Sequence, residues 1–511
     1  MSQERWKELP LDIISLIVPL LDRASLLKLR ASCRAFNELS IPTLLSWEVV
    51  LLDSTRLLSF CYFVLKDATI RGPLLRTLCI IPSAPLPHHI AEILRDVLSY
   101  ATRLRCLKLV PESLLDWDES SIAVIFDGVQ HLPELTTFSI RLGLVNTKLL
   151  SVPLVLPHIR TMTVQTDRDA TDTFDVLAPV APILEELRLL SWYHLDDSPD
   201  VTKDLGVVFP RLIHLTALDG YFRSLAPLTQ SFPALRTLTL NDDHDLDWFL
   251  SEDILFNADN IRDANLLARS WRTLDALTGA SGVLFRCAVR AQVHKLTVHD
   301  VLFTELGARW TQAVVRDTRP TFAYVLLSFL GPHFYGPLFP EDVPIPHLCL
   351  SMPPWSDGNP VYLPNILTGA TIADLVVRPS VAYVSDFRDA PEFADTLRVI
   401  ARTIPAVECI ELQPLDEEVG WALVKEGGWD EPVPEERRKI DSFSNLLKKC
   451  QADTMVGDIE RGLRGGLLYA NHGTFGKKRV SFIHSSRSAL DRLDIIIHLR
   501  MSKDRVIYHL G

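Results

Sequence analysis

The chain has 511 residues, too many for one compact core, so we expect a small module joined to a larger body or a repeat array. Hydrophobic residues make up 47% and charged residues 23% of the sequence, a globular composition that argues against disorder over most of the length. The formal net charge of -12 gives no electrostatic reason to expect DNA or RNA binding, because phosphate recognition requires a clustered basic surface.

The eight cysteines indicate a reducing compartment. None forms a C-x-x-C pair, and several lie in apolar runs, as Cys106 does in LRCLKL, where a free thiol behaves as a small hydrophobe. No N-terminal signal peptide is visible, and glycine, proline and histidine interrupt the most apolar later stretch, residues 323–339. We therefore expect an intracellular protein of the cytoplasm or nucleus, with no membrane partner.

The N-terminal stretch ELPLDIISLIVPLLDRASLLKLRASCRAFNEL, residues 8–39, predicts three short helices. The first is apolar nearly all round, so it should be covered on more than one side, and Pro19 should end or kink it. Asp22 is a suitable N-cap for the second helix, and Cys33 opens the third segment. Three helices in so few residues are at the lower limit for independent folding, so the module should need a partner.

This stretch resembles an F-box. It has Leu-Pro at 9–10, an acidic residue and isoleucines at 12–14, a leucine-rich middle and Cys-Arg-x-aromatic at 33–36, with Phe36 where the family commonly has tryptophan. The resemblance implies that residues 1–48 dock onto a Skp-type adaptor and through it onto a cullin–RING ubiquitin ligase. A helical cap on the following repeats is the alternative. The residues that the resemblance assigns to adaptor-facing or core contacts, two roles that the sequence does not separate, are Leu9, Pro10, Ile13, Ile17, Leu20, Leu21, Leu26, Leu29, Cys33 and Phe36.

One phrase returns along the body of the chain: an apolar residue, a proline, any residue, then L-x-x-L-x-L or a near relative. The five most complete copies place their prolines at steps of 24, 25, 28 and 23 residues. These prolines are Pro133, Pro157, Pro182, Pro210 and Pro233. Less complete copies begin at Leu74, Thr102, Gln292, Ile345, Thr371 and Ala406.

The repeated phrase predicts one short strand and one helix per unit. Alternate residues of TLTL or TMTV point to opposite faces, as in a half-buried strand. Between such strands, residues 87–101 and 120–130 have apolar residues at helical spacing. The units resemble leucine-rich repeats, although the asparagine of that motif is mostly missing and Asn241 is one of few candidates. We therefore predict an α/β fold in which residues 49–414 form an irregular leucine-rich-repeat solenoid, with an ordinary α/β domain as the alternative.

The outward residues of the predicted strands are candidate contacts for a target protein, because solenoids bind partners on their long strand-lined face. Threonines and a serine recur there, as in TTFSI and TMTV. Exposed arginines and aromatic residues often anchor interfaces. The candidate target-binding residues are Arg141, Gln165, Glu186, Arg188, Trp192 and Asn241.

No stretch predicts an active site, a cofactor or a metal. The acidic run at 241–247 lacks the glycine and terminal glutamate of a calcium loop. The glycine-rich run at 462–478 fits neither nucleotide-binding glycine motif. Residues 415–511 are less regular and could cap the array.

The combined pattern predicts a non-enzymatic function. Residues 1–48 would bind the adaptor, and the solenoid would bind a target protein, as in the substrate receptor of an SCF-type ubiquitin ligase. The alternative is a leucine-rich-repeat scaffold without a ligase role.

Overall fold

The structure, a computed structural model, describes residues 11–81, 86–110, 119–142, 156–166, 174, 177–190, 205–218, 225–241, 252–301, 305–327, 336–352, 363–379, 399–400, 404, 407, 409–412 and 421–424. The chain divides into two compact units, Met1–Arg437 and Arg438–Gly511, and every described residue belongs to the first. The domain boundaries expected after residues 48 and 414 stay predictions.

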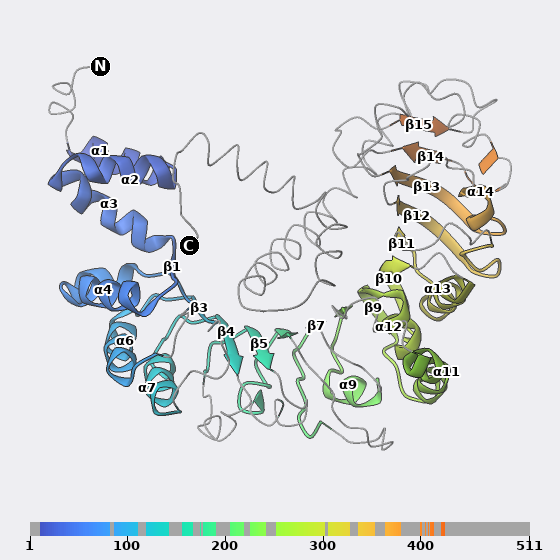
Figure 1. The fold of residues 1–511 in the computed structure, drawn as a ribbon, viewed down its shortest axis with the longest axis horizontal. Coiled ribbons are helices and arrows are strands. Elements are labelled where there is room, and N and C mark those ends of the chain that lie inside the picture. The colour runs from blue at the N-terminus through green and yellow to red at the C-terminus, as the bar shows by residue number, and fades with distance from the viewer. Residues whose placement is uncertain are drawn as a thin grey trace. The chain divides into compact units, whose positions relative to one another are not determined.

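The strands of the first unit form one 15-stranded sheet in which each strand lies beside the next strand of the chain (Figure 1). Every pairing from β1 to β14 is parallel, and β15 pairs antiparallel with β14. This arrangement confirms the α/β class and is compatible with a solenoid. The strands are β1 (Glu48–Leu51), β2 (Thr77–Ile80), β3 (Cys106–Leu109), β4 (Thr137–Leu142), β5 (Thr161–Thr166), β6 (Glu186–Leu190), β7 (His214–Leu218), β8 (Thr237–Asn241), β9 (Thr273–Ala280), β10 (Gln292–Val301), β11 (Phe322–Leu327), β12 (Pro344–Met352), β13 (Thr371–Pro379), β14 (Cys409–Leu412) and β15 (Trp421–Val424).

Helices precede the sheet and lie between its strands, and those after β1 form a layer on one side of it (Figure 1). The N-terminal helical segments are α1 (Leu11–Ile17), the 3-10 helix η2 (Val18–Leu20), α2 (Arg23–Ser32) and α3 (Arg34–Ser46). The later ones are α4 (Ser54–Leu65), α5 (Ala68–Arg71), the 3-10 helix η3 (Gly72–Leu74), α6 (His88–Tyr100), α7 (Glu119–Gln130), α9 (Ala226–Ser231), α11 (Glu252–Leu266), α12 (Ser281–Cys287), α13 (Glu305–Thr318) and α14 (Leu363–Ile366).

A strand lies at every copy of the repeated phrase. The five proline-led copies are β4 to β8, and the six less complete copies are β2, β3, β10, β12, β13 and β14. The repeat did not single out β11, in which Phe322 and Tyr324 are buried on the face opposite to Ala323 and Val325. A strand buried on both faces has no polar–apolar alternation to detect.

Packing between units explains the residues around the repeated prolines. The apolar residue before each proline is buried, as Phe209 and Phe232 show at 0% exposure, and so is the leucine or isoleucine two residues after it. The rings of Phe174, Phe209 and Phe232 all contact one another in edge-to-face or tilted pairs, with centroids 5.2 to 5.8 Å apart. Trp271 extends the contact by donating its indole N–H to the Phe232 carbonyl at 2.8 Å. The repeated phrase therefore encodes contacts between neighbouring units.

The register of neighbouring strands is set by one recurring backbone contact. The carbonyl just ahead of a strand accepts two consecutive backbone N–H groups at the start of the next unit's strand. The Arg160 carbonyl, for example, accepts from Glu185 at 2.9 Å and Glu186 at 3.0 Å, and the Ile213 carbonyl accepts from Arg236 and Thr237. The carbonyls of Arg76, Arg105, Thr136 and Glu185 accept equivalent pairs of N–H groups, and the Arg236 carbonyl accepts from Asp275 and Ala276, the third and fourth residues of β9.

Polar side chains also tie neighbouring units together within the helical layer. Asn265 accepts from the Leu225 N–H and donates to the Arg286 carbonyl, both within 2.9 Å. Arg262 forms an ion pair with Asp317 at 2.6 Å. Burial raises the pKa of Asp317, and the nearby Arg262 opposes that rise.

Six cysteines are free in the part of the chain that the structure describes. Burial raises the pKa of Cys61 and of Cys287 to about 12, so both remain neutral thiols at physiological pH. None of the described helices combines the length and apolarity needed to cross a bilayer.

We expect Leu238→Ala to lower the free energy of unfolding by about 2–5 kcal/mol, because it opens a cavity beneath β8. Leu238 is fully buried, whereas the next residue, Thr239, points to the other face and is half-exposed. Thr239→Ala is the matched control, with an expected loss below about 1 kcal/mol. Urea unfolding followed by tryptophan fluorescence measures both. Equal losses would contradict the assignment of the two faces.

Candidate protein-binding surfaces

The N-terminal helices have a hydrophobic core of their own. Ile14, Val18 and Leu26 are buried at 5%, 1% and 0% exposure, in a cluster distinct from the main core of the sheet. Six partly buried residues pack around them: Leu21, Leu29, Phe36, Leu39, Leu44 and Trp47. We call residues 11–47 the N-terminal module.

Local signals determine how the module begins. The α-helix ends at Ile17, and Pro19 lies in the 3-10 turn that follows, as expected of a proline late in a helix. Asp22 caps α2, as predicted, by accepting from the Ser25 N–H at 2.7 Å. That backbone hydrogen bond also lowers the pKa of the Asp22 carboxyl.

The opposite side of the first helical segment is apolar and exposed. Ile13, Leu16, Ile17 and Leu20 are 40%, 68%, 38% and 82% exposed and follow one another at helical spacing. Leu27 on α2 is a further exposed leucine, at 46%. We call these five residues the apolar stripe. Clustered exposed apolar residues are typical of a surface that another molecule covers.

The structure separates the residues for which the sequence left two roles open. Of the predicted adaptor contacts, Ile13, Ile17 and Leu20 belong to the stripe, and Cys33 is also exposed. Of the two roles that the sequence left open for Leu26, the structure shows the core role, because its side chain is fully buried in the module core. Leu21, Leu29 and Phe36 are partly buried around that core, and Leu9 and Pro10 lie outside the described residues.

The exposed stripe residues Leu16 and Leu27 were not among the predicted contacts. Both were apolar in the sequence, but so was nearly every neighbouring position. Which side of an all-apolar helix faces outward depends on where the next helices pack.

Helix α3 joins the module to the sheet. Its residues Phe36, Leu39 and Leu44 pack against the module core, whereas Ile41 and Leu45 are buried in the main core. The apolar segment 41–53 contains the end of this helix and strand β1. One helix shared between two cores couples the position of the module to the first strands of the sheet.

The second surface is the face of the sheet that points away from the main core. From β4 to β8, and from Ala276 and Lys295 onward in β9 and β10, buried residues alternate with exposed or half-exposed ones, which align in rows across the strands. The first row is Thr137, Thr161, Glu186, His214, Thr237, Ala276 and Lys295. The second row is Ser139, Thr163, Arg188, Thr216, Thr239, Thr278 and Thr297, and on β4 to β6 a third row continues with Arg141, Gln165 and Leu190. We call these rows the open face.

Most predicted target-binding residues lie on this face. Arg141, Gln165, Glu186 and Arg188 come from three adjacent strands, β4 to β6. Asn241 is the last residue of β8, and the structure does not describe its side chain; Trp192 lies outside the described residues. Their role in binding stays a prediction.

An ion pair organises the centre of the open face. Arg188 donates from Nε to Glu186 Oε1 at 2.6 Å and also pairs with this oxygen through Nη2. The other carboxylate oxygen of Glu186 accepts from Thr161 Oγ1 at 3.3 Å. The side chains of Arg188 and Glu186 are only 27% and 25% exposed, so a neighbouring strand and partial burial hold the pair in place.

Among the described residues, no group of three or more histidine, cysteine, aspartate or glutamate side chains is arranged to hold a metal. Residues 242–247 of the acidic run and the glycine-rich run at 462–478 lie outside those residues.

No protein-family model matches the sequence, and a search of curated proteins found no similar chain. A function must therefore be inferred from the geometry of the two surfaces and from the residue pattern.

We expect Leu26→Ala to loosen the module without affecting the centre of the sheet, because the two cores are separate. Hydrogen exchange followed by mass spectrometry should show faster exchange in α1 to α3 and unchanged exchange in β7 and β8, with local opening easier by about 2–5 kcal/mol. Leu20→Ala, at a position 82% exposed, is the control and should leave exchange unchanged. An equal increase in exchange along the whole first unit would contradict the separation of the cores.

Proposed function

We propose that this chain is the substrate-recognition subunit of an SCF-type cullin–RING ubiquitin ligase. Its N-terminal module would bind a Skp-type adaptor, and its sheet would bind the target protein. The observation that carries the proposal is the apolar stripe, exposed on a helical module that already has its own core. The resemblance of residues 8–39 to an F-box supports the choice of adaptor.

The energetics of the stripe favour a protein partner. Fully burying a leucine or isoleucine side chain contributes roughly 1.5–3 kcal/mol. The five side chains of the stripe, within residues 13–27, stay exposed when the chain folds. A partner that buried them would therefore gain several kcal/mol of binding free energy. A helical cap on the first repeat would turn these residues toward the chain body, whereas Leu16 and Leu20 are mostly exposed.

The connection through α3 fits a delivery role. A substrate receptor must hold its target at a defined position, so that target lysines are concentrated near the transferring enzyme. Because α3 contributes to both cores, bending between adaptor and sheet would require breaking one of them. The chain itself would make and break no covalent bond.

The finer identity of the body, an irregular leucine-rich-repeat solenoid, is also part of the proposal. Its support is the recurring phrase, the chain-order stacking of parallel strands and the helical layer on one side. Such arrays present a long strand-lined face that suits an extended partner. The proposed role would place the protein in the cytoplasm or nucleus.

We expect the double substitution Leu16→Asp and Leu20→Asp to weaken adaptor binding at least about tenfold, because charges replace apolar contacts at the centre of the stripe. The measurement is titration of the full-length chain with a purified Skp-type adaptor by calorimetry. Leu267→Asp is the matched control, since Leu267 is a 90% exposed leucine after α11.

Unchanged adaptor affinity in the double variant would contradict the stripe as the docking surface. A wild-type chain that does not bind any Skp-type adaptor would favour the alternative, a repeat scaffold without a ligase role.

A further inference from the structure

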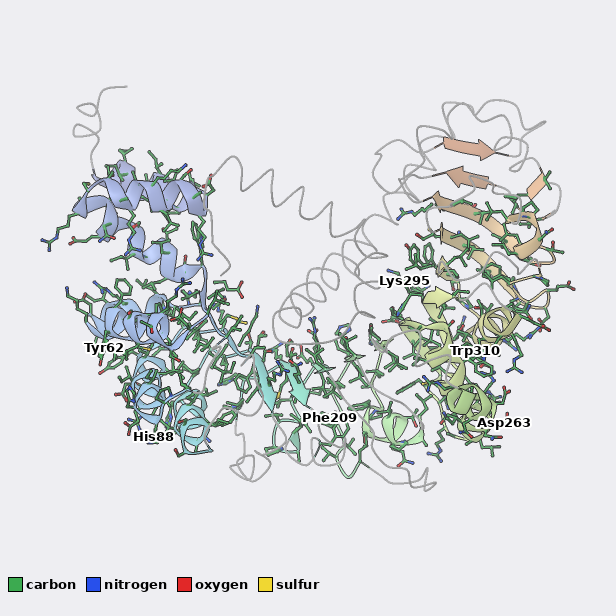
Figure 2. All side chains as sticks on the ribbon, in the orientation of Figure 1. Tyr62, His88, Phe209, Asp263, Lys295 and Trp310 are labelled. Carbon is green, nitrogen blue, oxygen red and sulfur yellow. The ribbon has the colours of Figure 1, made fainter. Side chains whose placement is uncertain are left out.

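The open face is more basic than the chain as a whole. Its rows contain three basic side chains, Arg141, Arg188 and Lys295, and one acidic side chain, Glu186, a net charge of +2 among the described positions. The whole chain carries -12. Figure 2 shows Lys295 on the strand side, whereas His88 and Asp263 lie in the helical layer. The excess of basic side chains in these rows favours anionic over cationic groups at this face.

Two arginines flank strand β5. Arg141 on β4 is in register with Gln165, and Arg188 on β6 is in register with Thr163, two residues earlier on the same strand. Their Cα atoms are separated by two strand spacings of roughly 4.8 Å and one two-residue step of roughly 6.6 Å. An anionic group above β5 would lie between two long cationic side chains, beside a hydroxyl and an amide.

The Arg188 guanidinium is positioned in advance. Glu186 engages its Nε and Nη2, and Thr161 holds Glu186 in turn. A guanidinium has five N–H donors in a planar fork that matches a carboxylate, so further donors remain beyond those two. Partial burial strengthens its interaction with an anion relative to a fully solvated arginine.

Neutral hydroxyls surround the charged centre. The second row presents Ser139, Thr163, Thr216, Thr239, Thr278 and Thr297 on successive strands, interrupted by Arg188. Hydroxyls both donate and accept hydrogen bonds, so they can pair with the amides and carbonyls of a peptide that crosses the strands. Their spacing of roughly 4.8 Å repeats along the sheet.

We propose that the open face from β4 to β10 binds an extended acidic peptide segment, with Arg141 and Arg188 contacting its carboxylates over β5. The inference deepens the proposed function. It rests on that function only in assigning the acidic segment to the target protein. A net charge of +2 is too small for a nucleic-acid surface, which needs many phosphate contacts. The hydroxyl rows offer peptide-like hydrogen bonding and little apolar area.

The test uses the full-length chain and a phage-displayed library of random dodecapeptides. Selected peptides should be enriched in aspartate and glutamate. One enriched peptide, labelled with fluorescein, is then titrated by anisotropy, and both Arg141→Gln and Arg188→Gln should weaken its binding roughly three- to tenfold. Glu186→Gln should tighten binding about threefold, because it removes the negative charge that competes for Arg188, while the amide oxygen can still accept from Arg188 and hold it in position.

A neighbouring ion pair supplies the control. Arg160 Nη1 lies 3.3 Å from Glu185 Oε1, one residue ahead of β5 and β6, and Arg160 is 66% exposed. Arg160→Gln removes one positive charge from the unit of β5, between the units that carry Arg141 and Arg188, without changing a residue of the rows. It should leave the affinity for the labelled peptide unchanged.

Three results would overturn the proposal: no acidic enrichment, unchanged binding in the Arg141→Gln and Arg188→Gln variants, or an affinity of Glu186→Gln equal to or below the wild type. A peptide that binds only after its glutamates are replaced by phosphoserine would overturn the assignment to carboxylates. The variant with Leu16→Asp and Leu20→Asp should bind the peptide like the wild type. Failure of adaptor binding and failure of peptide binding are therefore separate outcomes.

Discussion

Parallel pairing of each strand with its neighbour in the chain is the constraint on which the rest of the structure depends. No single unit, with one short strand and one connection, has enough apolar surface to bury by itself. From β2 to β8, the backbone carbonyl just ahead of the strand accepts two N–H groups of the next unit, which keeps these successive units in one register. The same register aligns buried leucines on one side and hydroxyls on the other. One face of the sheet is thus used for folding, and from β4 to β10 the other face stays partly exposed.

The N-terminal module is the exception to this continuity. Its small core around Ile14, Val18 and Leu26 does not merge with the main core, and α3 is the helix that contributes to both. A module connected in this way holds a fixed position without losing its outer surface. The apolar stripe and the open face are consequently separate surfaces, which is the minimum that a protein linking two partners requires.

Much of the body was predictable because its contacts recur. The apolar residue before each proline and the alternation in TMTV or TLTL follow from packing between like units, and every copy of the phrase is a strand. The same reasoning could not find β11, whose two faces are both buried and so do not alternate. Along the N-terminal helices, the sequence predicted the Asp22 cap and the break at Pro19 from local chemistry. It did not predict that α3 would continue through Pro42 into the main core.

The sequence by itself determined the α/β class, the chain positions of most strands and the residues that alternate across them, because these depend on period and on neighbours in the chain. Only the tertiary structure decided which side of the first helix is exposed. Ile13 and Ile14 are adjacent and chemically alike, yet one is 40% exposed and the other 5%, because α2 and α3 pack on a single side. It likewise decided that Arg141 and Arg188, separated by 47 positions in the sequence, flank the same strand. Such proximity depends on the register between units, which no local pattern specifies.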